Sequence, residues 1–171
     1  TKRSNVNFNA NYRYAVPGGS ELNIDGDYGF FNLKNNQFQP NDYFSAGGTV
    51  KQYSTSNRMI SPTEITIYSL KVDYEQNFKK GKLGYGGRIG FVNTVNNFNR
   101  TSIEDTKVTG ESNRFAYNEN INAAYVNYNR AFKGFMIQAG LRIENTNSNG
   151  HSTGVLNNGN ATSFDSSVKR N

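Results

Sequence analysis

Strict alternation of apolar and polar residues is the leading feature of this chain, and it is clearest over residues 5–16. One face of the predicted strand carries Val6, Phe8, Ala10, Tyr12, Tyr14 and Val16, and the other carries Asn5, Asn7, Asn9, Asn11 and Arg13. A period of two residues is typical of a β-strand. The run exceeds the roughly 5–6 residues of an average soluble strand and is long enough to cross a bilayer obliquely. It predicts either a transmembrane strand or a long edge strand of a soluble antiparallel sheet.

The same alternation recurs in three predicted hairpins, each closed by a short turn that contains glycine. The hairpins span residues 3–33, 65–95 and 114–146, with their turns at 17–20, 79–81 and 133–134. Glycine readily supplies the positive φ that tight hairpin turns require. The pattern therefore predicts an all-β fold, an antiparallel up-and-down meander of about six strands.

Long polar stretches separate the hairpins, and their composition predicts loops. They cover residues 34–63, 96–113 and 147–171 and contain several Asn, Gly and Pro residues. Soluble domains rarely hold unstructured loops of this length, whereas outer-membrane barrels alternate short periplasmic turns with long extracellular loops. This rhythm favours one unit, residues 1–171, as a segment of a large transmembrane β-barrel.

The parity of each predicted strand assigns side chains to the two faces of the sheet. The residues predicted to face lipid are Tyr12, Leu70, Val72, Tyr74, Ile89, Phe91, Leu141 and Ile143. Those predicted to face inward include Lys71, Asp73, Arg88, Gln138, Arg142 and Glu144. Aromatic residues near the short turns predict a periplasmic girdle. Residues 119–125 have the opposite parity, which a β-bulge would accommodate.

Composition agrees with a barrel that has no packed apolar interior. Only 35% of the 171 residues are hydrophobic and the mean hydropathy is −0.76, whereas soluble domains carry about 45–50% apolar residues. The aromatic content of 13% argues against disorder. There is no cysteine, which excludes disulfides and thiolate metal sites. Because Thr1 is not a natural start, we expect the chain to be a processed or excised piece.

Charge and candidate chemistry predict no enzyme, no cofactor and no nucleic-acid partner. The net charge is +6, but most Lys and Arg residues stand singly on alternating strands rather than in one patch. His151 is the only histidine, and we expect it to be solvated in a loop. Asp25-Gly26-Asp27 lacks the remaining ligands of a calcium loop and is interpreted as lining the lumen.

Two further polar or glycine-rich motifs have ordinary structural interpretations. Glu104-Asp105 is interpreted as a solvated loop, although it could bind a cation weakly. The glycines at positions 84, 86, 87 and 90 are not a phosphate loop, because no helix follows them. They are interpreted as strand glycines at bends or at close approaches of the backbone.

Several stretches resemble the barrel of TonB-dependent outer-membrane receptors, in the branch known as outer-membrane β-barrel family proteins. They are Leu22–Gly29, Gln39–Asn41, Tyr117–Val126, Gln138–Thr146 and Asp165–Ser167, and the resemblance covers essentially the whole chain. It implies a barrel of about 22 strands with an N-terminal plug, in the outer membrane of a Gram-negative bacterium. It also implies energised import of a scarce nutrient, such as a metal chelate or a glycan.

This chain shows no plug domain and no energy-coupling box, and about six strands cannot close a barrel. The resemblance therefore implies a segment from the middle of the barrel. Its expected partners are membrane lipid, the rest of the receptor barrel and plug, and a small nutrient ligand.

Two functions are compatible with the sequence. The first is a structural segment of an outer-membrane receptor that takes up a scarce nutrient, with its loops contributing to ligand capture. Its candidate ligand contacts are Tyr43, Phe44, Tyr53 and Arg58. The alternative is a soluble antiparallel β-sheet that acts as a binding or adhesion module. In isolation we expect the chain to self-associate, because open sheet edges and an exposed apolar face recruit partners.

Overall fold

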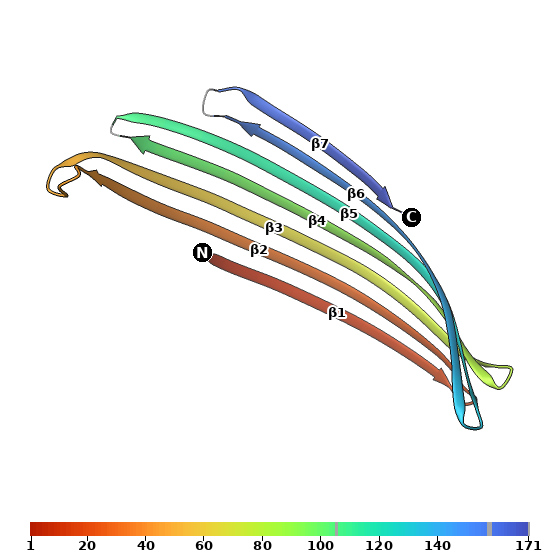
Figure 1. The fold of residues 1–171 in the computed structure, drawn as a ribbon. Coiled ribbons are helices and arrows are strands. Elements are labelled where there is room, and N and C mark those ends of the chain that lie inside the picture. The colour runs from red at the N-terminus through yellow and green to blue at the C-terminus, as the bar shows by residue number, and fades with distance from the viewer. Residues whose placement is uncertain (105, 157–158, 171) are drawn as a thin grey trace.

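The computed structural model describes residues 1–104, 106–156 and 159–170, which form one sheet of antiparallel strands (Figure 1). The seven strands are β1 (Lys2–Val16), β2 (Ser20–Phe44), β3 (Lys51–Phe78), β4 (Gly81–Glu104), β5 (Lys107–Phe132), β6 (Phe135–Val155) and β7 (Ala161–Arg170). Each strand pairs with its neighbours in sequence, so the sheet order is β1 to β7. The predicted meander is confirmed, with seven strands rather than about six because the predicted C-terminal loop contains β7.

Three short turns lie together at one end of the sheet, at the lower right of Figure 1. Gly18, Gly19 and Gly134 have φ values of 118°, 99° and 96°, as expected for glycine in tight turns. At the second turn the expectation was wrong, because Lys79 and Lys80 adopt positive φ values of 46° and 61° and Gly81 does not. Gly81 is needed for space instead, since a Cβ there would lie 2.4 Å from the backbone oxygen of Asn129.

The long loops predicted at residues 34–63, 96–113 and 147–171 are mostly strand. β2 and β3 continue to a short connection at residues 45–50, β4 and β5 almost meet, and β7 occupies part of the expected tail. Beyond the apolar stretches both faces of these strands are predominantly polar, with scattered apolar residues, so the sequence loses the alternation that would reveal a strand. Amides and hydroxyls link the strands there: Asn96 donates to Thr63 at 2.6 Å, and Asn113 donates to Ser152 at 2.9 Å.

Pairing is continuous through residues 119–125, so the β-bulge considered there is absent. β5 keeps one register with β4 and with β6 over this stretch. As a result Ile121, Ala123 and Tyr125 lie on the otherwise polar face, while Asn120 and Asn122 lie on the apolar face. The register shift in the β2–β3 pair falls between Tyr43 and Phe44.

The sheet is a single open layer with no packed core. Among the described residues Ala123 is the only buried hydrophobic residue, and the apolar side chains Leu141 and Ile143 are 77% and 74% exposed. β1 and β7 are the two free edges. None of the described residues belongs to a helix of the length and apolarity that crossing a membrane would need. The sheet therefore needs other material on its apolar face and along both edges.

The second turn offers a direct test of this backbone geometry. Replacing Lys79 with Asn and Lys80 with Gly should stabilise the folded full-length protein by about 1 kcal/mol, because Asn and Gly tolerate two successive positive φ values better than lysine does. Gly134→Ala at the third turn should destabilise it by a similar amount. Denaturant unfolding measures both, and an equal loss in the two variants would contradict the turn geometry.

Candidate functional surfaces of the sheet

One face of the sheet carries a continuous apolar band next to the short turns. The band consists of alternate residues in six strands: 6–16 in β1, 22–30 in β2, 68–78 in β3, 83–91 in β4, 124–132 in β5 and 135–143 in β6. Its two polar members, Gln76 and Arg130, lie close to the turns. Each strand contributes about ten residues, the length that a tilted strand needs to cross a bilayer.

The apolar band runs diagonally across the hydrogen-bonded ladder. A row is here a set of residues directly opposite one another in successive strands. The edge of the band away from the turns is Val6 in β1 and Ile143 in β6, yet Ile143 lies in the row of Tyr12. The edge thus moves by six residues over five strand pairs. With about 3.3 Å per residue and 4.8 Å between strands, a band kept level corresponds to strands tilted by about 40°, within the range of transmembrane barrels.

All eight residues predicted to face lipid lie on this face. Leu70 is opposite Ile89, Tyr68 is opposite Phe91, and Tyr12 shares a row with Ile143. Aromatic rings pair across strands near both edges: Tyr28 and Tyr68 lie 5.2 Å apart, and Phe132 and Phe135 lie 4.9 Å apart. The structure thus brings the predicted set together, and its contact with lipid stays a prediction.

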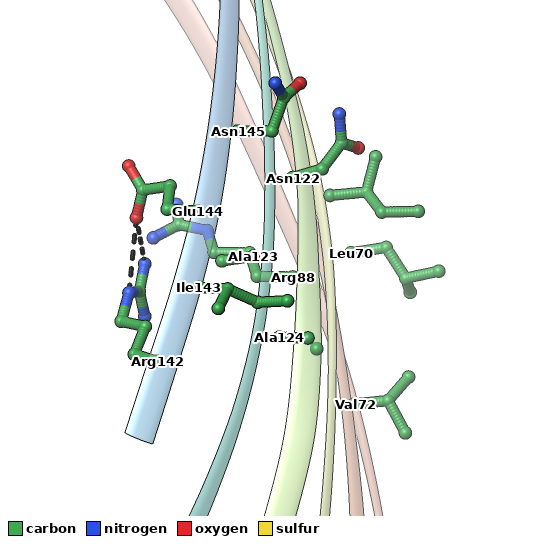
Figure 2. A pocket seen from close by; sticks show the side chains of 12 residues that line it. Leu70, Val72, Arg88, Asn122, Ala123, Ala124, Arg142, Ile143, Glu144 and Asn145 are labelled. Atoms are coloured by element: carbon green, nitrogen blue, oxygen red, sulfur yellow. Dashed lines mark hydrogen bonds and ion pairs between the residues drawn. The ribbon is translucent and has the colours of Figure 1, made fainter. Parts of the chain in front are cut away.

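A groove of about 870 Å³ lies on the apolar face where small residues replace large ones. Gly87 and Ala124 lie side by side in one row, with Val72 and Ile143 next to them on either side. Figure 2 shows Leu70 and Val72 on one side of the sheet, and Arg142 and Glu144, joined by their ion pair, on the other. The two faces therefore differ sharply in chemistry over a thickness of one sheet.

Asparagine amides end the apolar band on β5 and β6. Asn122 donates to Asn120 at 2.5 Å, and Asn147 donates to Asn145 at 2.7 Å. These four side chains lie in the rows of Ile89 and Phe91, which are still apolar in β4. The sequence pattern suggested a bulge here, whereas the register shows that the band simply ends earlier on these two strands.

The opposite face carries ion pairs between neighbouring strands and along single strands. Among the described residues there are five such pairs, with nitrogen–oxygen distances of 2.5–3.2 Å: Arg13–Glu21, Lys71–Asp73, Lys82–Glu75, Arg100–Glu111 and Arg142–Glu144. Asp25 and Asp27 also face this side, where Asn11 and Asn9 donate to them at 2.5 and 2.7 Å. The polar face is therefore a hydrogen-bonded surface whose charges are largely matched.

The side chain of Tyr125 extends over Gly86 and contacts the carboxylate of Asp73, two strands away. Its hydroxyl donates to Asp73 of β3, and its ring covers Gly86 of the intervening strand β4. A Cβ at Gly86 would lie 2.5 Å from the Val72 backbone oxygen and 2.8 Å from the Tyr125 hydroxyl. The guanidinium of Arg142 lies 5.9 Å from the Tyr125 ring centre, within cation–π range. The glycine is recognisable in the sequence, but this arrangement is not, because it depends on the register between three strands.

The tip of the β2–β3 hairpin brings together two of the four candidate ligand contacts. Tyr43 and Tyr53 lie opposite each other with their rings stacked, 4.3 Å between centres and 14° between planes. Both belong to the rows of the polar face. Phe44 follows the register shift and is exposed, and Arg58 lies on the other face, opposite Phe38. The structure therefore joins the tyrosines and separates Arg58 from them.

An ion pair holds this tip together beside the stacked rings. Lys51 of β3 donates to Asp42 of β2 at 2.7 Å. This hydrogen bond, with another from Ser54, holds the pKa of the Asp42 carboxyl below its ordinary value. The carboxylate is therefore charged at neutral pH, and the ion pair links the two strands beside the register shift between Tyr43 and Phe44.

The remaining candidate residues form no recognisable catalytic or metal centre. His151 was expected in a loop but lies in β6, where its ring contacts the Asp165 carboxylate of β7. Glu104 ends β4, and Asp105 lies outside the described residues. In the described part of the chain no three His, Cys, Asp or Glu side chains are grouped to hold a metal ion.

Comparison with known proteins adds a family and a fold. A model of the "Outer membrane protein beta-barrel family" matches residues 17–167. Among solved structures, the ferric yersiniabactin uptake receptor FyuA from Yersinia pestis matches with a TM-score of 0.63 and 14% identity. The match covers 98% of this chain and 24% of the receptor chain, so the sheet corresponds to a minor part of such a protein. A comparison with curated protein sequences found no match to the chain.

The close approach at Gly86 predicts an unequal effect of two identical substitutions. Gly86→Ala should destabilise the folded full-length protein by about 1–3 kcal/mol, because the new methyl group collides with backbone and displaces Tyr125 from Asp73. Gly90→Ala is the matched control on the same face of the same strand, where a Cβ would have no neighbour closer than 3.9 Å. Denaturant unfolding in detergent should show little change for this control. Equal losses would contradict the assigned contact.

Proposed function

The chain belongs to the outer membrane protein beta-barrel family, and from this premise we propose that it is a wall segment of a receptor that takes up a scarce nutrient. Its place is the outer membrane, and its fold is that of a receptor barrel. The observation that carries the proposal is the division of chemistry between the two faces. A tilted apolar band suits lipid, and a charge-matched polar face suits the lumen of a barrel.

The orientation of the segment follows from its turns. Outer-membrane barrels place short turns in the periplasm and long hairpins outside the cell. The turns at residues 17–19, 79–80 and 133–134 would then be periplasmic, and the β2–β3 tip would be extracellular. The strands beyond the apolar band would stand above the membrane as an extension of the barrel wall.

The open edges of β1 and β7 imply that more strands complete the barrel. Unpaired backbone groups are not tolerated in hydrocarbon, and seven strands leave two rows of them. In the receptor these edges would pair with the rest of the barrel wall. In the isolated chain they would pair with other copies, which is why self-association remains our expectation for the fragment.

Ligand capture is assigned to the stacked tyrosines. Tyr43 and Tyr53 lie at the extracellular tip on the lumen side, where an incoming solute would pass. Stacked rings offer a flat apolar surface with hydroxyl groups at its margin, which suits a nutrient with both apolar and polar parts. Phe44, the next residue of β2, has the opposite parity and lies on the outer side, as Arg58 does. The role is non-enzymatic, since the site offers contacts and no reacting group.

The alternative, a soluble binding or adhesion sheet, has less support. A soluble sheet would have to cover its apolar face with its own residues, and here that face is bare from β1 to β6. The family match also supports the outer membrane rather than a soluble module.

Uptake measurements test the proposed role of the tip. A strain that lacks the full-length receptor would be screened for growth on ferric chelates and oligosaccharides as limiting nutrients. On the nutrient that requires the receptor, Tyr43→Ala with Tyr53→Ala should reduce uptake at low concentration by about tenfold or more, because truncated aromatic anchors commonly cost this much in binding. Phe38→Ala, which removes an exposed ring on the outer side, is the control and should leave uptake unchanged. Equal uptake by all three proteins, present in equal amounts, would contradict a role of the tip in capture.

A further inference from the structure

The net positive charge of the chain is distributed unevenly between the two faces. On the polar face, the proposed lumen side, the positive and negative charges of the described residues balance. The cations of these lumen-side rows are Arg3, Arg13, Lys71, Lys82, Arg88, Arg100, Lys107, Arg142 and Arg170, and their anions are Glu21, Asp25, Asp27, Asp73, Glu75, Glu104, Glu111, Glu119 and Glu144. On the opposite face, whose rows contain the apolar band and are here called the outward rows, the charges do not balance. Above the apolar band they carry Lys2, Lys34, Arg58, Arg114 and Lys169 against Glu64 and Asp165; Asp42 also lies in these rows, at the β2–β3 tip, where Lys51 matches its charge.

The two sets of cations also differ in their partners. Five lumen-side cations make ion pairs, as described above. None of the five outward cations makes an ion pair with any described residue. The outward carboxylates have other partners: Asn32 donates to Glu64 at 3.1 Å, His151 contacts Asp165, and Lys51 pairs with Asp42. The outward basic residues are therefore available to an external anion.

Lys2 and Lys34 form the most concentrated part of this outward charge. They lie directly opposite each other in the β1–β2 ladder, an arrangement of like charges that destabilises a sheet. They are four residues beyond Val6 and Phe30, the edge of the apolar band. At about 3.3 Å per residue and a tilt of about 40°, the ammonium groups lie roughly 10 Å above the hydrocarbon, at the level of lipid headgroups.

We propose that Lys2 and Lys34 bind the phosphate groups of outer-leaflet glycolipids. A phosphate between the two ammonium groups would convert their mutual repulsion into two charge-assisted hydrogen bonds. Free phosphate would not explain the position of the pair, which coincides with the membrane surface and lies on the lipid side of the sheet. Arg58 and Arg114, farther from the band on the same face, extend the basic surface toward the sugar portion of such a lipid.

This inference rests on the proposed outer-membrane orientation, and a binding experiment separates the two. The full-length receptor would be purified in detergent free of glycolipid and titrated with outer-leaflet glycolipid, either intact or enzymatically dephosphorylated. Wild type should bind the intact lipid much more tightly than the dephosphorylated one. In Lys2→Gln with Lys34→Gln the half-saturating concentration of intact lipid should rise about thirtyfold, since each basic side chain near an anionic surface contributes about a factor of five. Lys79→Gln with Lys80→Gln, at the periplasmic turn, is the matched control and should bind like wild type.

Stability gives a second, opposite signature. Without glycolipid the Lys2→Gln, Lys34→Gln protein should unfold at a temperature equal to or above that of wild type, because a like-charge pair is removed. With intact glycolipid the order should reverse. If the double variant fails to fold, each single Gln variant should still weaken binding about fivefold. Equal binding of both lipid forms, or equal losses in the test and control variants, would overturn the glycolipid site alone. A wild-type protein absent from the outer membrane would overturn the proposed function as well.

Discussion

Every backbone N–H and C=O group inside a bilayer must find its hydrogen-bond partner within the protein, and this requirement governs the whole architecture. Antiparallel strands satisfy it with the neighbour that follows in sequence, so short turns such as Lys79-Lys80 are sufficient to build the sheet. Since the ladder satisfies the backbone, the two faces are free to adopt different chemistries. Only alternate residues over about ten positions per strand must be apolar, which explains how a chain with 35% hydrophobic residues can serve as a membrane wall.

The tilt of the strands connects this ladder to the distribution of side chains. A level membrane crosses tilted strands diagonally, so the apolar band ends at Val6 in β1 but at the row of Tyr12 in β6. The same diagonal explains why, in the direction away from the turns, the apolar band on β5 ends at Ala124 and gives way to Asn122 and Asn120. Their neighbours in β4, Ile89 and Phe91, are still apolar. Among the described residues, charges are matched on the polar face, whereas basic residues without ion pairs lie on the opposite face beyond the apolar band.

The features that could be predicted from the sequence are those that depend on the two-residue alternation of apolar and polar side chains. The three hairpins, their turns and the shared face of Leu70, Ile89 and Leu141 all follow from alternation between an apolar and a polar environment. The parts of the strands beyond the apolar band were not predicted, because predominantly polar residues on both faces remove that alternation and leave a composition typical of loops. Tyr125 over Gly86, and Tyr43 against Tyr53, depend on register between strands, which a single strand pattern does not contain. Arg58 was grouped with the tyrosines by proximity in sequence, and parity separated it from them.

Depth-resolved accessibility of single cysteines measures the tilted band most directly, and the chain itself contains no cysteine that would interfere. Spin labels would be placed one at a time along β1 and β6 of the full-length receptor in bilayers, and relaxed by oxygen from the lipid or by a water-soluble nickel chelate. A tilted apolar band predicts that lipid accessibility alternates with a period of two residues. Its centre should lie near Ala10–Tyr12 in β1 and near Ala139 in β6, about five residues farther along the ladder toward the turns. Uniform exposure to the nickel chelate on both faces, or a lipid maximum in the same row of both strands, would contradict it.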